Sequence, residues 1–227
     1  MRRLIVAIVL LGATAMVHAD PPKPLVLNPR VTTDKSVDCS TIDSILADLV
    51  EPGMTDEQKV IAVFNWIRLM IVHGDGPKAL AYDFHKMIHV MGNGSCLRQT
   101  TPMAYLLKRL GYECRSWTHN GHHMMEVKYG GKWHCFDPHM TFYVYDRGDP
   151  RNIASVAQLR ADATLAADAV KEGRACPGYL LCGDKPSVFG PGGRWRLEKG
   201  WPKLKVEEPF GRVALPRGMA YRFTWMP

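Results

Sequence analysis

Apolar residues recur at helical spacing over two stretches of this 227-residue chain, one near residue 60 and one near residue 105. In the first stretch, Thr55 and Gln58 form a capping box ahead of an apolar stripe. The stripe consists of five residues: Val60, Ile61, Phe64, Ile67 and Ile71. This spacing predicts an amphipathic helix over residues 56–72, with its apolar face in the core.

The second stripe follows Cys96 and consists of Met103, Leu106, Leu107 and Leu110. It predicts a helix that ends at Gly111, because glycine adopts the left-handed conformation of a helix cap without strain. Shorter helices are expected from a cap at Ser40 to about residue 50, near residues 84–91, and over residues 154–171 behind a second capping box.

Three strand-like segments lie between these helices, at about residues 112–118, 122–129 and 132–137. The last two are separated by Gly130-Gly131, which suits a two-residue hairpin turn. In that register Tyr129 pairs with Lys132, and Asp137 lies opposite Met124.

The same register decides which histidine faces Asp137. His122 is two residues before Met124, so it lies on the face of Asp137, diagonally across the hairpin at about 7–8 Å between backbones. His123 points to the opposite face. A three-residue turn would reverse this parity and favour His123.

The N-terminus has the pattern of an export signal. A short basic start precedes an apolar run over residues 4–17 that is too short to span a bilayer comfortably, and small residues follow at a spacing suited to cleavage after Ala19. An uncleaved N-terminal anchor is the alternative. We therefore expect a protein exported to the periplasm, the cell envelope or the medium, without stable membrane insertion after cleavage.

The rest of the chain divides by composition. Residues 20–54 are expected to form a proline-rich lead-in and a short helix, residues 55–172 the core, and residues 173–227 a Gly/Pro-rich extension with short strands, for example at 219–225. The formal net charge of +7 is scattered, without the basic stripe and interleaved aromatic residues of a nucleic-acid binder. This pattern argues against a nucleic-acid partner.

Six cysteines in an exported chain would ordinarily suggest disulfides: Cys39, Cys96, Cys114, Cys135, Cys176 and Cys182. Cys176 and Cys182 bracket a short loop containing Pro and Gly and are the most plausible pair. If Cys96 is a free nucleophile, at least one other cysteine is also unpaired.

Cys96 stands in the most informative context of the six. Gly92 and Gly94 precede it and suit a tight turn into the helix that follows. At a helix N-terminus, free N–H groups and the helix dipole favour a thiolate and can hold an oxyanion. Pro102 leaves two alternatives, because the helix either begins at Cys96 and is distorted near the proline or begins later, with Cys96 on a preceding turn.

Cys96, His122 and Asp137 are the side chains that a thiol nucleophile requires, namely a sulfur, a base and an orienting carboxylate. A zinc site is a competing interpretation, because five histidines lie close to Cys135: His119, His122, His123, His134 and His139. No closed ligand spacing such as Cys-x-x-Cys is present. We therefore expect neither a metal nor a cofactor.

At these residues the chain resembles the transglutaminase-like superfamily, a papain-related group. The resemblance covers roughly residues 55–145 and has four parts: the capped helix 55–72, Gly-x-Gly-x-Cys at 92–96, Gly121-His122 followed by Glu126-Val127, and Gly131-Lys132-Trp133 leading to Phe136-Asp137-Pro138. It implies an α+β fold in which N-terminal helices and a cysteine-bearing helix pack on an antiparallel sheet. It also implies Cys96 as nucleophile, His122 as base and Asp137 as orienting acid.

The chain departs from the family pattern at Met124, where members commonly carry an aromatic residue, and just after the cysteine, where Leu97-Arg98-Gln99 lacks the frequent acid. These differences concern substrate binding and leave the triad intact. The function expected is that of an exported cysteine enzyme acting on an amide or peptide bond of a protein or peptide-like substrate. The alternative is a non-catalytic envelope module built on the same scaffold.

Overall fold

The computed structural model describes residues 26–27, 36–74, 82–162, 164–175, 194–206 and 214–215. The chain forms two units, one from residues 32–211 and one from residues 1–31 and 212–227. In the smaller unit, β1 (Val26–Leu27) pairs antiparallel with β8 (Ala214–Leu215). The predicted signal peptide, the Cys176–Cys182 pair and the strand at 219–225 lie outside the described residues.

The larger unit is built on a four-stranded antiparallel sheet with the strand order β6-β5-β4-β7. Its strands are β4 (Glu113–His119), β5 (His122–Tyr129), β6 (Lys132–Phe136) and β7 (Trp195–Leu197). Residues 194–206, assigned from the sequence to the C-terminal extension, belong to this unit, and β7 pairs with β4 at the edge of the sheet.

The predicted hairpin register is confirmed, because Tyr129 pairs with Lys132 and Met125 with Phe136. Gly130 and Gly131 have φ angles of 56° and 76°, which a two-residue turn of this kind requires. The last strand is one residue shorter than predicted, since the backbone of Asp137 exchanges hydrogen bonds of 2.8 Å with that of Phe142.

Two N-terminal helices precede the sheet. α1 (Ile42–Leu49) is capped by Thr41, one residue later than predicted, because Thr41 and Ser44 form the capping box. α2 (Asp56–Met70) has the predicted box of Thr55 and Gln58. A short α3 (Phe84–Lys86) continues into the π-helical turn η2 (Met87–Met91).

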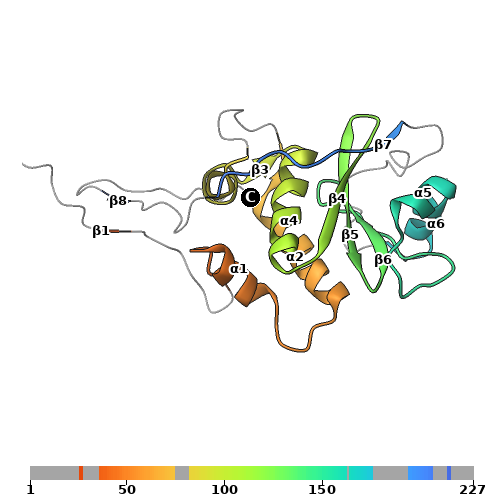
Figure 1. Cartoon of the computed structure of the whole chain (residues 1–227), viewed down its shortest axis with the longest axis horizontal. Helices are drawn as coiled ribbons and strands as arrows, with labels where there is room; N and C mark the ends of the chain where they lie inside the picture. The colour runs from red at the N-terminus through yellow and green to blue at the C-terminus, as the bar shows by residue number, and fades with distance from the viewer. Residues whose placement is uncertain are drawn as a thin grey trace, which may run out of the picture. The chain divides into compact units, whose positions relative to one another are not determined.

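α4 (Cys96–Arg109) is the helix on which the core is assembled. It contacts α2 on one side and β4 and β5 on the other, as Figure 1 shows. Fully buried side chains from α2, α4 and β5 belong to the core: Phe64, Ile67, Met103, Leu106, Met124 and Met125. The fold is thus α+β, with the cysteine-bearing helix packed on an antiparallel sheet.

The predicted helix over residues 154–171 is divided into α5 (Val156–Ala161) and α6 (Leu165–Lys171), and α5 contacts both β6 and α6 (Figure 1). The break follows from Asp162, whose carboxylate accepts hydrogen bonds of 2.9 Å from the N–H and hydroxyl groups of Thr164. An aspartate that captures a nearby N–H in this way competes with helix continuation. None of the helices in the described ranges is long and apolar enough to cross a bilayer.

Candidate active site

Cys96 is the first residue of α4, so the helix begins at the earlier of the two predicted positions. The helix also continues through Pro102. The chain reaches Cys96 through a short parallel pairing of β2 (Val72–His73) with β3 (Asn93–Gly94). A side chain on Gly94 would meet Arg98 at 2.8 Å, so a glycine is needed where the strand enters the helix.

The N-terminus of α4 leaves hydrogen-bond donors available beside the thiol. Ser95 stands at the N-cap in extended conformation, but its side chain makes no capping hydrogen bond. The N–H groups of Cys96 and Leu97 have no acceptor within the helix, because they lie in its first turn. This arrangement is favourable for a negative charge at Cys96.

His122 and Asp137 are hydrogen-bonded to each other through His122 Nε2 and Asp137 Oδ2. The Asp137 carboxylate is fully buried, and its other oxygen accepts the backbone N–H groups of His139 and Met140, each at 3.0 Å. The turn after β6 therefore fixes the carboxylate, and the carboxylate in turn fixes the imidazole. The predicted pairing of His122 with Asp137 is present in the structure.

The thiol of Cys96 completes the group. Burial alone would raise its pKa, but hydrogen bonds from the His122 side chain and from the backbone N–H of His123 prevail and lower the pKa of Cys96 below its ordinary value. Because His122 Nε2 is engaged with Asp137, Nδ1 is the ring nitrogen left for the thiol. Cys96, His122 and Asp137 thus form one connected chain of contacts.

The electrostatics of His122 complement those of the thiol. Burial would lower its pKa, but the Asp137 carboxylate and the contact with Cys96 raise it to about 10. A raised pKa at the imidazole and a lowered pKa at the thiol both favour an imidazolium–thiolate pair. The two groups interact closely enough to titrate together.

His123, the alternative base, serves the site through its backbone. Its backbone N–H helps to lower the pKa of Cys96, while the pKa of its own ring is influenced by Glu198 and Arg196 of the segment around β7. Burial lowers the pKa of His123, so its ring is neutral at neutral pH. The register prediction in favour of His122 therefore agrees with the structure.

The remaining histidines considered as zinc ligands are dispersed among separate contacts. His134 contacts the backbone oxygens of Ile153 and Tyr129, and His119 stacks on Trp195. Cys135 is fully buried, and burial raises the pKa of its thiol well above the ordinary value. In the part of the chain that the structure describes, no three such side chains are arranged to hold a metal ion.

Gln99 and His139 lie beside the triad, and the sequence did not predict that they contact each other there. Gln99 is almost fully buried on α4, one turn after Cys96, and its side-chain oxygen lies 2.8 Å from His139 Nδ1. The His139 ring in turn lies 5.5 Å from the His122 ring, between centroids. The spacing of three residues between Cys96 and Gln99 is the sequence signal that could have placed both on one helix face.

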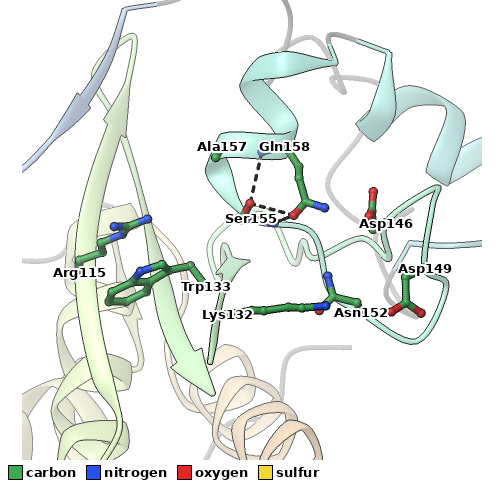
Figure 2. Close-up of a pocket in the computed structure, with 9 residues that line it drawn as sticks. All are labelled: Arg115, Lys132, Trp133, Asp146, Asp149, Asn152, Ser155, Ala157 and Gln158. Atoms are coloured by element: carbon green, nitrogen blue, oxygen red, sulfur yellow. Dashed lines mark hydrogen bonds between the residues drawn. The ribbon is translucent and has the colours of Figure 1, made fainter. Parts of the chain in front are cut away.

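A cavity of about 350 Å³ opens elsewhere, near the Lys132 end of β6, as Figure 2 shows. Arg115 and Trp133 form one wall, and Asp146 and Asp149 stand across from them. None of Cys96, His122 and Asp137 lines this cavity. Its walls carry no cysteine or histidine, so it offers none of the nucleophilic chemistry of the triad.

Comparisons of the chain with protein-family models, with curated proteins and with solved structures give no match. Among the described cysteines, Cys96, Cys114 and Cys135 carry free thiols. Of these, Cys96 is the one in contact with a histidine and a carboxylate that are themselves paired.

Proposed function

We propose that this chain is an exported cysteine-dependent enzyme of the transglutaminase-like, papain-related type. It acts on an amide or peptide bond of a protein or peptide-like substrate through a thioester acyl-enzyme. The observation that carries the proposal is the contact of Cys96, at the start of α4, with a His122 ring that is hydrogen-bonded to the buried Asp137. Export is proposed from the basic and apolar N-terminal pattern.

In the first step, the Cys96 thiolate attacks the carbonyl carbon of the substrate, and a carbon–sulfur bond forms. The electron pair of the carbonyl double bond moves to oxygen, which becomes an oxyanion. The uncapped N–H groups in the first turn of α4 are suitable donors to this oxygen. Such donors typically contribute about 10²–10³-fold to the rate.

In the second step, the His122 imidazolium donates its proton to the amide nitrogen. The carbon–nitrogen bond breaks, the amine leaves, and the acyl group remains on sulfur as a thioester. His122, now neutral, takes a proton from water or from an acceptor amine as that molecule attacks the thioester. Breakage of the carbon–sulfur bond then releases the product and restores the thiolate and the imidazolium.

Asp137 orients the imidazole and stabilises its charged form throughout. Its carboxylate accepts from Nε2, which directs Nδ1 toward the sulfur. Because two backbone N–H groups hold its second oxygen, the carboxylate cannot turn away easily. This is the division of roles that a nucleophile–base–acid triad requires.

The test is the rate at which an electrophilic peptide-like probe labels Cys96 in the full chain at pH 6.5, followed by peptide mass spectrometry. We expect fast labelling of Cys96, none after Cys96→Ala, and slow labelling of Cys96 in His122→Ala. Cys114 is the internal control, since burial raises the pKa of its thiol to about 12. Labelling of Cys96 that is as slow as that of Cys114, and unchanged by His122→Ala, would contradict the proposal and favour a non-catalytic module.

A further inference from the structure

Gln99 connects the helix of the nucleophile to two other segments. Its side-chain nitrogen donates to the backbone oxygen of Ile71, just after α2, and its oxygen lies 2.8 Å from His139 Nδ1 in the turn after β6. The side chain is only 2% exposed. A buried amide is costly unless it is hydrogen-bonded, and here both of its ends have partners.

These partners fix a proton on Nδ1 of His139. The Ile71 carbonyl can only accept, so the Gln99 amide nitrogen must face it and the Gln99 oxygen must face His139. An amide oxygen is an acceptor, so His139 carries its proton on Nδ1. Both the neutral ring, with an unprotonated Nε2, and the imidazolium carry this proton, so the groups around the ring decide its charge.

The charges around His139 agree with a neutral ring. Burial and the neighbouring rings of His73 and His122 outweigh the Asp137 carboxylate and lower the pKa of His139 to about 4. The His73 ring packs edge-on against it at 4.2 Å between centroids. When His139 is neutral, the Asp137 carboxylate stabilises the charge of His122 alone. A second imidazolium at His139 would compete for the same carboxylate.

His139 also holds the acid directly, because its backbone N–H donates to Asp137 Oδ1 at 3.0 Å. One residue therefore touches the carboxylate of Asp137 through its backbone and the nucleophile helix through its side chain. The path from Cys96 along α4 to Gln99, His139 and Asp137 does not pass through His122. It can therefore set the separation between nucleophile and acid independently of the base.

We propose that Gln99 and His139 are a positioning pair that fixes the Asp137 turn against α4, so that the His122 ring meets the Cys96 sulfur. This inference rests on the proposed function. Neither residue touches the reacting atoms in this scheme, and the donor on His139 is the essential feature. Misplacement of reacting groups by about 1 Å can cost about 100-fold in rate.

The experiment measures the alkylation rate of Cys96 by iodoacetamide between pH 5 and pH 10 in the full chain, in three variants of the pair and in one control variant. Gln99→Met removes both hydrogen bonds at similar volume. His139→Leu removes the donor, whereas His139→Asn keeps an N–H near the place of Nδ1 and cannot become charged. Ser155→Ala is the matched control, because it removes a helix cap distant in sequence from the triad.

We expect Gln99→Met and His139→Leu to react at least about tenfold more slowly below pH 7, with the rate rising only at higher pH. His139→Asn and Ser155→Ala should retain the wild-type pH profile. If His139→Asn is as slow as His139→Leu, the donor role is wrong. If wild-type Cys96 is fast and all variants match it, the positioning pair is wrong while the proposed function stands; if wild-type Cys96 is no faster than Cys114, the proposed function itself fails.

Discussion

Replacing Asp137 with asparagine is the most direct perturbation of the candidate triad. The amide has the shape of the carboxylate, and its oxygen can still accept the backbone N–H groups of His139 and Met140. Its nitrogen then faces His122 Nε2, where the carboxylate accepts in the wild type. A donor at this position disfavours the imidazolium and selects the tautomer whose proton lies on Nδ1, facing the sulfur.

The magnitude follows from the pKa of His122. A rise from 6.5 to about 10 corresponds to about 5 kcal/mol in favour of the charged ring. The Asp137 carboxylate contributes more to this rise than Cys96 does, so we assign it at least about half, or ~2–3 kcal/mol. Loss of that stabilisation predicts a decrease of about 30–150-fold in the equilibrium constant for forming the imidazolium–thiolate pair.

The assay is the alkylation rate of Cys96 by iodoacetamide from pH 5 to pH 10, read by peptide mass spectrometry. Wild type should react rapidly at pH 6, whereas Asp137→Asn should react about 100-fold more slowly there and recover as the thiol ionises at higher pH. Asp149→Asn, on the loop beside the distant cavity, is the control. An Asp137→Asn profile that coincides with that of the wild type would refute the assigned role of Asp137.

Further predictions concern the scaffold. Thr55→Ala should lower the free energy of unfolding by about 1 kcal/mol in urea titrations, because it removes the capping box of α2. Gly94→Ala should destabilise the chain and slow alkylation of Cys96 in the same samples, since the new methyl group would lie 2.8 Å from Arg98. Glu126→Gln should lower the free energy of unfolding by about 3 kcal/mol, because the buried carboxylate accepts from Arg115, Trp117 and the first N–H of α5. Finally, the free energy of unfolding of wild type should fall faster than that of His139→Asn as the pH decreases from 6.5 toward 4. The reason is that His139 binds a proton in the unfolded chain over this range, whereas in the folded chain its lowered pKa prevents it. Parallel pH profiles of the two free energies would contradict this.

The part of the site that lies in the hairpin was predictable because it is local. Two glycines at 130 and 131 define a two-residue turn, and the alternation of side chains along the strands then determines that His122, and not His123, shares a face with Asp137. The start of α4 at Cys96 could not be decided in this way. Local preferences at Thr101-Pro102 favoured a later start, whereas packing of the whole helix against α2 and the sheet supports the earlier one.

The contacts that the sequence could not predict join segments far apart along the chain. The Gln99–His139 hydrogen bond spans 40 residues, and β7 joins the sheet nearly 80 residues after β4. Neither contact leaves a periodic signal, because each depends on how separate elements are placed in three dimensions. The division of the helix at 154–171 was missed for a different reason, since a single side chain, Asp162, competes with an otherwise helical pattern.

The distinction between local and distant contacts also bears on how the site works. The pairing of His122 with Asp137 lies within one hairpin and the turn after it, so any fold that keeps this hairpin retains the base and its acid. To place the Cys96 sulfur against that pair, α4 must lie at the right distance from the sheet, which we call its depth, and at the right rotation about its own axis. Burial of the apolar face of α4 fixes the depth, because Met103, Leu106 and Leu107 are fully enclosed. Rotation needs a directional contact close to the nucleophile, and Gln99, one turn from Cys96 with both ends of its amide engaged, supplies it.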